Sequence, residues 1–192
     1  REQTQRMIWY AQSKTVPTSP PAVDAQGHAW AGGRLGLVAQ MRGTDATQRY
    51  QTDSVHQILS VAHLADGRLL AAGEEGYVAV SSADRKSWRA VPAPVSRASA
   101  GVFVTQAADR TVYLVSRTPR GVVVFAADPA DLAWKEVHRV ERDTTTATAN
   151  GSWVRIASFG YARPMATITR DRLVVYTPDP ELLSSMDLRT KT

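Results

Sequence analysis

Short blocks of apolar residues alternate with turn-forming residues between Val55 and Val91. Runs rich in Val, Leu, Ile and Ala, or opened by an aromatic residue, occupy Ile58 to Ala65, Arg68 to Ala72, Tyr77 to Ser81 and Trp88 to Val91. Between them lie Asp66-Gly67, Gly73 to Gly76 and Ser82 to Ser87. Glycine accepts positive φ at no steric cost and aspartate bonds locally to the backbone, so these segments are typical of tight turns. The pattern predicts four short antiparallel strands.

The same layout recurs farther along the chain. A second set of strand-like runs occupies Val102 to Ala108, Thr111 to Ser116, Gly121 to Ala126 and Trp134 to Val137. Gly121 follows Gly76 by 45 residues, and Trp134 follows Trp88 by 46. A period in the forties with four strands per unit is typical of β-propeller blades. A β-sandwich of hairpins shares the alternation but gives no reason for this period.

Both faces of a blade pack against neighbouring blades, so small and β-branched residues are expected on both sides of its strands. The valines of the two repeats fit this expectation, namely Val78, Val80, Val122, Val123 and Val124. Two partial units flank the clear ones. His28 to Ala31 and Leu35 to Met41 resemble the middle of a blade, and Trp153 to Ser158 with Arg172 to Tyr176 resemble a divergent one.

The segment between the third and fourth strands of the first clear repeat reads Ser81-Ser82-Ala83-Asp84-Arg85-Lys86-Ser87-Trp88. It resembles the Asp-box, Ser-x-Asp-Gly-Gly-x-Thr-Trp, of BNR-repeat propellers, which include sialidases and Ycf48-like photosystem-assembly proteins. Ser81, Ser87 and Trp88 are in register, whereas Asp84 lies one position late and Arg85 replaces a glycine. The resemblance implies that Ser81, Asp84 and Trp88 are structural, because in this family the Asp turn and the Trp lock the hairpin.

We therefore expect an all-β chain of four-stranded propeller blades. Residues 1–16 are an N-terminal extension or outer strand, residues 17–180 hold about four blades, with clear ones at 54–97 and 98–142, and residues 181–192 are a C-terminal tail. The resemblance implies six or seven blades, so we expect the chain to be part of a larger propeller. The alternatives are a four-bladed propeller and a ring that a partner completes. Because it begins at Arg1 with no leader ahead of the domain, we also expect a mature or trimmed chain.

The composition excludes several kinds of chemical site and partner. The 192 residues are 43% apolar, with a formal net charge of +5 and no cysteine, which excludes disulfides, thiolate metal sites and a Cys nucleophile. The basic residues are scattered instead of concentrated on one element, so we expect no nucleic-acid partner. No apolar run approaches the roughly 20 residues that span a bilayer, so we expect no transmembrane segment here.

We expect a ligand to bind at one end of the blades. The second-to-third-strand loops and the links between blades share that end, opposite the Asp-box turn. Candidate ligand-binding residues there are Arg34, Glu74, Glu75, Arg117, Arg120, Tyr161 and Arg163. Arginines bind anionic groups bidentately, and Glu and Tyr could supply acid–base or nucleophilic chemistry of the sialidase kind. The alternative is that all are solvated turn residues.

No complete catalytic set is present. A sialidase-like protein needs a Phe/Tyr-Arg-Ile-Pro segment and an arginine triad, and Tyr161 to Pro164 matches the first only in part. His56 and His63, seven apart, would lie on opposite faces of a strand, so we expect no metal there and no cofactor. We expect a non-catalytic scaffold that binds a protein partner, periplasmic or extracellular and compatible with a membrane-associated complex. The alternative is a glycan-binding or sialidase-like propeller.

Overall fold

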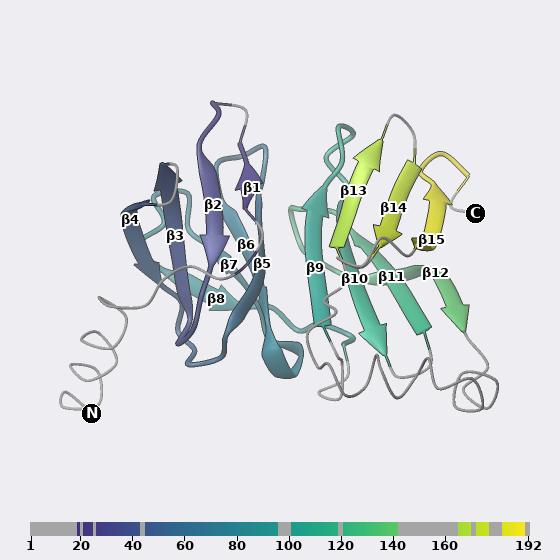
Figure 1. Ribbon diagram of the computed structural model, residues 1–192, viewed down its shortest axis with the longest axis horizontal. Coiled ribbons are helices and arrows are strands. Elements are labelled where there is room, and N and C mark those ends of the chain that lie inside the picture. The colour runs from purple at the N-terminus through teal and green to yellow at the C-terminus, as the bar shows by residue number, and fades with distance from the viewer. Residues whose placement is uncertain are drawn as a thin grey trace. The chain divides into compact units, whose positions relative to one another are not determined.

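The computed structural model describes residues 19, 21–24, 26–42, 45–95, 101–118, 121–141, 165–169, 172–176 and 182–190 (Figure 1). This part of the chain contains fifteen β-strands and one 3-10 turn, η1 (Glu74–Gly76). Within it, no helix has the length and apolar character needed to span a bilayer. The chain divides into two compact units, Arg1–Ala93 and Pro94–Thr192, which are described separately.

The first unit contains two four-stranded antiparallel sheets in which neighbours in the chain are neighbours in the sheet. The first sheet consists of β1 (Ala22–Val23), β2 (Ala29–Gly32), β3 (Leu37–Arg42) and β4 (Asp45–Gln51). The second consists of β5 (Ile58–His63), β6 (Leu69–Gly73), β7 (Val78–Ser81) and β8 (Trp88–Ala90). Strand β5 lies against β1 and β2, so the first strand of one sheet meets the first strands of the other.

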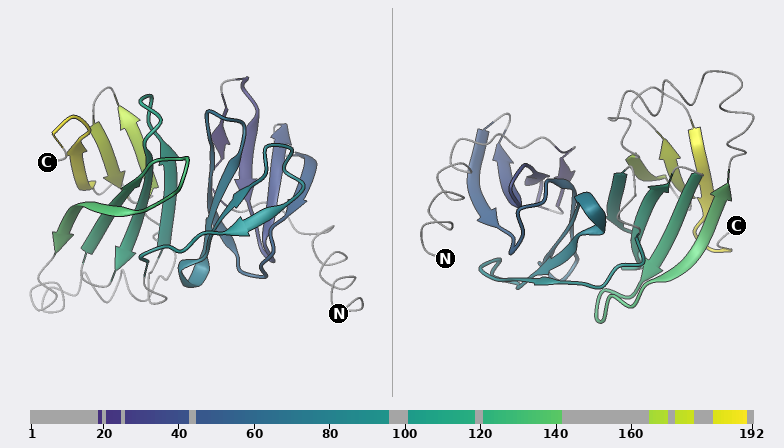
Figure 2. Two further views of the ribbon diagram at one scale, coloured as in Figure 1. Left: turned by 180° about the vertical axis from the view of Figure 1, so that it is seen from behind. Right: turned by 90° about the horizontal axis from the view of Figure 1, so that it is seen from below.

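The second unit repeats this design. Its first sheet consists of β9 (Gly101–Gln106), β10 (Val112–Thr118), β11 (Gly121–Ala127) and β12 (Lys135–Glu141), again in chain order. Its other sheet consists of β13 (Met165–Thr169), β14 (Arg172–Tyr176) and β15 (Leu182–Asp187). Figure 2 shows both sheets from two further sides. Strand β13 lies against β9, which repeats the first-strand contact of the other unit.

The strands predicted for the two clear repeats are confirmed, with ends that coincide or differ by at most four residues. Each repeat places all four strands in one sheet, for example with Val61 opposite Ala71 and Ala71 opposite Ala79. A sandwich would divide a repeat between two sheets.

The structure differs from the sequence analysis at four segments. Strand β15 occupies part of the segment expected to be a tail without a fold. Strands β1 and β4 complete the first sheet, where only its two middle strands were predicted. Arg117 and Thr118 extend β10 instead of opening a loop. Trp153 to Ser158 lie outside the described residues.

Burial follows the position of each strand in its sheet. All five residues of β6 are buried, and so are all four of β7, whereas β4 and β8 are largely exposed. Successive residues of a strand point to opposite faces, so an unbroken buried run means that both faces are covered. The five valines predicted to pack on both faces are all buried.

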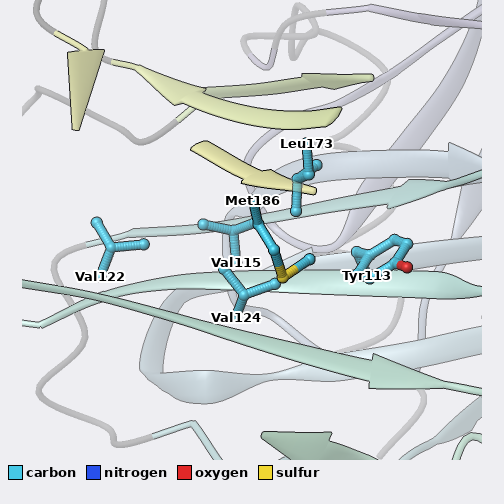
Figure 3. Close-up of a cluster of buried hydrophobic side chains, with 6 residues drawn as sticks. All are labelled: Tyr113, Val115, Val122, Val124, Leu173 and Met186. Atoms are coloured by element: carbon cyan, nitrogen blue, oxygen red, sulfur yellow. The ribbon is translucent and has the colours of Figure 1, made fainter. Parts of the chain in front are cut away.

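Each unit has an apolar core between its two sheets. In the first unit the core contains Trp30, Val38, Ile58, Val61, Leu69 and Ala71. In the second unit it contains Tyr113, Val115, Val122, Val124, Leu173 and Met186 (Figure 3). Met186 from β15 lies with Val115 and Val124 of the facing sheet, and all three are almost fully buried. Strand β15 is therefore part of the core.

The turn from the first to the second strand has one backbone design in three sheets. It spans residues 24–28, 64–68 and 107–111. In each, the first N–H donates to the fifth carbonyl and the fourth N–H donates to the first carbonyl, at 2.8–3.0 Å. The fourth residue has positive φ each time, namely 81° at Gly27, 88° at Gly67 and 70° at Arg110. The repeat predicted from the sequence is thus also a repeat of hydrogen bonds.

Candidate functional site

Two loops of the first unit, Gly33–Leu37 and Gly73–Tyr77, present candidate residues at the same end of their sheets. In both, the first N–H donates to the fifth carbonyl, at 2.9 and 2.8 Å, and the fifth N–H donates to the second carbonyl, at 3.2 and 3.1 Å. In both, the third and fourth residues have positive φ. Arg34 and Glu74 therefore occupy equivalent positions in two superposable loops.

Both loops are fastened to the segment Thr52–Gln57, the link between β4 and β5, which we call the link segment. Gly36 N–H donates to the His56 carbonyl at 2.8 Å, and Thr52 N–H donates to the Gly36 carbonyl at 3.0 Å. Glu74 N–H donates to the Gln57 carbonyl at 3.0 Å. A Cβ at Gly36 would lie 2.1 Å from the Ser54 carbonyl oxygen, so this close approach requires glycine. The loops and the link segment form one fixed surface.

The side chains on this surface are mixed in character. Arg34, Glu74 and Glu75 are exposed, and Val55 is 56% exposed, an unusual position for a large apolar side chain. Tyr77 donates its hydroxyl hydrogen to the Asp53 carboxylate. Burial, reinforced by this bond, raises the pKa of Tyr77 well above its usual value. Tyr77 is thus a fixed hydrogen-bond donor at neutral pH and not a nucleophile.

The predicted ligand-binding residues are brought together in part. Arg34, Glu74 and Glu75 lie in loops at the link end of the first unit, and their role in ligand binding stays a prediction. Arg117, expected in a loop, is 7% exposed inside β10, where it lies opposite Val122. Arg120, Tyr161 and Arg163 lie outside the described residues, so their convergence stays a prediction.

The turn between β7 and β8, where the Asp-box was suggested, is closed by its own side chains. The Asp84 carboxylate accepts hydrogen bonds from the Ser82 hydroxyl at 2.6 Å and the Lys86 N–H at 3.2 Å. Both bonds lower the pKa of Asp84, and the bond from the Ser82 hydroxyl has the larger effect. Arg85, which stands where the family has glycine, has φ of 62°. Asp84 thus acts within the turn, while membership of the Asp-box class stays a prediction.

The sequence analysis missed Asp24, a buried carboxylate at the opposite end from the candidate loops. Its oxygens accept from the backbone N–H of Gln26 and His28 at 3.0 and 2.8 Å, and from the Trp30 indole at 3.0 Å, with the His28 ring at 3.1 Å. Burial alone would raise its pKa, but these bonds outweigh burial and lower the pKa to about 2.

A comparison of the repeats could have found it. The position of Asp24 in the five-residue turn is taken by Leu64 and Ala107 in the other two turns. A carboxylate at a position that is otherwise apolar is the signal. Among the described residues, no three His, Asp or Glu side chains gather closely enough to hold a metal ion.

No protein-family profile matches the chain, and no curated protein matches its sequence. Solved structures do match it. The β-propeller domain of Cps50 (Swd1) from Myceliophteria thermophila superposes with a TM-score of 0.53 and 14% identity, over 93% of this chain and 57% of that one. These sheets are the blades of a β-propeller.

Two Ycf48 structures show the same likeness. Ycf48 from Cyanidioschyzon merolae matches with a TM-score of 0.51 and 15% identity, over 91% of this chain and 59% of that one. Ycf48 bound to a D1 peptide matches with a TM-score of 0.51 and 11% identity, over 90% and 54%. The chain thus spans a little over half the length of these propellers. We call its sheets blade 1 (β1–β4), blade 2 (β5–β8), blade 3 (β9–β12) and blade 4 (β13–β15).

Proposed function

We propose that the chain is a non-catalytic β-propeller module that binds a protein partner through the link end of blades 1 and 2. The observation that carries the proposal is the fastening of both candidate loops to the link segment. Loops already held in one conformation lose little entropy when a partner binds, so more of the contact energy appears as affinity.

The surface has the composition of a small recognition site. An exposed apolar side chain, Val55, lies on the link segment to which the loops carrying Arg34, Glu74 and Glu75 are bonded. Apolar contact supplies affinity, and charges of both signs around it select the partner and set its orientation. One propeller of the same fold, Ycf48, is seen bound to a peptide, which supports binding as the class of function.

The first test is a pull-down from the native host with the full chain as bait. The site variant carries Arg34→Glu and Glu74→Arg, and the control carries Lys86→Glu, an exposed residue in the β7–β8 turn at the opposite end. We expect the wild type and the control to retain the same partner. The site variant should recover less of that partner, by about tenfold or more. Recovery of no partner, or equal recovery by all three baits, would contradict the proposal.

A second test addresses preorganisation with two glycines. Gly36→Ala forces a Cβ against the Ser54 carbonyl, whereas Gly27→Ala at the other end also introduces a residue at positive φ but meets no atom within 4 Å. We expect Gly36→Ala to lower partner affinity at least tenfold and Gly27→Ala to leave it unchanged, although both lose some stability. Isothermal titration calorimetry with the recovered partner measures the two affinities. Equal affinities of the two variants would show that binding does not depend on the link segment.

The glycan alternative is decided on the same preparation. A glycan array and a fluorogenic sialoside assay would both be silent for a protein-binding module. A specific glycan signal that Arg34→Glu abolishes would identify the ligand as a glycan instead of a protein. We propose a periplasmic or extracellular location, which fractionation of the host and immunoblotting would check.

A further inference from the structure

At the turn end of the first unit, three side chains stack between blades 1 and 2. The Arg85 guanidinium, from the β7–β8 turn, lies 4.6 Å from the centre of the Trp30 ring on β2. His63, the last residue of β5, stacks on Trp30 at 6.4 Å between ring centres and 26° between planes. Trp30 is completely buried. Arg85 and His63 of blade 2 thus cover an aromatic side chain of blade 1.

Arg85 is held weakly for a residue in this position. Its Nη2 lies 3.5 Å from His63 Nε2 and 3.4 Å from the Gly67 carbonyl oxygen, both at the long limit of a hydrogen bond. Its Nε is buried without a partner, and its φ of 62° is unfavourable for a residue with a Cβ. Arg85 is therefore held by the face of Trp30 together with these two long contacts.

The contact between Arg85 and His63 requires a neutral imidazole. A guanidinium can only donate hydrogen bonds, so a hydrogen bond across this contact requires His63 Nε2 to be the acceptor. Burial, together with the charge of Arg85, also lowers the pKa of His63. The arrangement seen here is therefore compatible with the neutral form of His63.

Other charged groups around His63 act in both directions. Asp24 of the β1–β2 turn and Asp66 of the β5–β6 turn favour protonation, while His28 opposes it with Arg85. Both carboxylates already have partners, because Asp24 accepts from Trp30 and His28, and Asp66 is paired with Arg68 at 2.6 Å. Among these charges Asp24 has the largest effect on the pKa of His63, and Arg85 has the next largest.

We propose that the His63–Arg85 contact is an acid-sensitive latch between blades 1 and 2. Protonation of His63 turns its Nε2 into a donor that faces the Arg85 donor and places two cations side by side. The contact is then lost and Arg85 leaves the face of Trp30, while the hydrogen bonds that close the β7–β8 turn remain. Deprotonation restores the contact.

The test is a pH titration of the full chain by NMR, from pH 7.5 to pH 4.5. The reporters are the His63 ring and the Trp30 indole N–H, assigned from His63→Gln and Trp30→Phe. We expect the Trp30 resonance to move with the His63 midpoint, which lies below 6.5. In Arg85→Gln the His63 midpoint moves up by about half a pH unit, because a neutral donor replaces the cation.

His56→Gln is the matched control, because His56 lies in the link segment ahead of β5, at the opposite end of that strand from His63, and its substitution leaves the transition in place. His63→Gln abolishes the Trp30 transition. A Trp30 transition that persists in His63→Gln, or that is absent from the wild type, overturns the proposal. If His63→Gln does not fold, the His63 midpoint of Arg85→Gln decides, and an unchanged midpoint likewise overturns it.

Discussion

The contact between blades 1 and 2 and the contact between blades 3 and 4 both join first strands, but their side chains differ. Trp30 and Tyr113 each follow the five-residue turn by two positions, and both are completely buried. Trp30 is bonded to a carboxylate and covered by Arg85 and His63. Tyr113 packs in a cluster with Leu173 and Met186. The first contact contains charged groups and responds to pH, whereas the second depends on apolar packing.

The difference begins at a single position. Asp24 opens the turn of blade 1, while Ala107 opens the same turn of blade 3. A buried carboxylate is stable only with several donors, and Trp30 supplies one that Tyr113, without an indole, could not supply in the same place. The repeat therefore conserves the turn while the side chains of each blade are free to diverge.

Leu173→Ala is expected to cause the largest loss. It removes a completely buried side chain from the apolar contact and should lower the free energy of unfolding by about 3 kcal/mol, with the same loss at pH 7 and pH 3. Urea denaturation measures this. Val55→Ala, at an exposed position, should change stability by less than about 0.5 kcal/mol. A loss at Leu173 below about 1 kcal/mol would show that blade 4 adds little to the core.

Asp24→Asn tests the charged contact. A pKa lowered from 3.8 to about 2 gives stability that is present above pH 3.8 and lost as pH falls through about 2. The variant should therefore be about 2 kcal/mol less stable than the wild type at pH 7. The gap should narrow below pH 3.8 and close near pH 2. Urea denaturation across this range measures the gap, and a gap independent of pH would contradict the role of the ionised carboxylate.

Two glycine substitutions isolate the smallest effect, the stacking of Arg85 on Trp30. Arg85 and Arg110 both have positive φ, and glycine should relieve each by about 0.5–1 kcal/mol. Arg110→Gly should keep that gain, because Arg110 is exposed. Arg85→Gly should show almost no net change, because it also loses about 0.5–1 kcal/mol of stacking. Thermal unfolding compares them, and equal gains would mean that the stacking contributes nothing.

The fold was predictable where the pattern was local. Alternation of apolar residues and turn residues located the strands of blades 2 and 3, because buried strands and tight turns leave a mark in the nearby sequence. Strand β4 leaves no such mark. Its residues from Asp45 to Gln51 are mostly exposed, so no apolar run was needed. Strand β15 was missed because only the contact of Met186 with residues far away in the sequence shows that it is buried.

The candidate site was predictable only in part. The ordering of strands in a blade places Arg34, Glu74 and Glu75 at one end, and no distance is needed for that inference. The burial of Arg117 and the bonds of Asp24 depend on contacts between segments that the sequence does not connect. Positive φ at Arg85 was equally hidden, because arginine gives no hint of a left-handed backbone.

The two loops at the link end, Gly33–Leu37 and Gly73–Tyr77, share one backbone conformation. Their matching hydrogen bonds are made by the backbone, and the second position is arginine in one loop and glutamate in the other, where the Glu74 carboxylate also accepts from the Gln57 N–H at 3.4 Å. The five residues of one loop could replace those of the other, or the charged residue could be substituted, while the blades keep their backbone structure. Such a surface can acquire new specificities by small local substitutions.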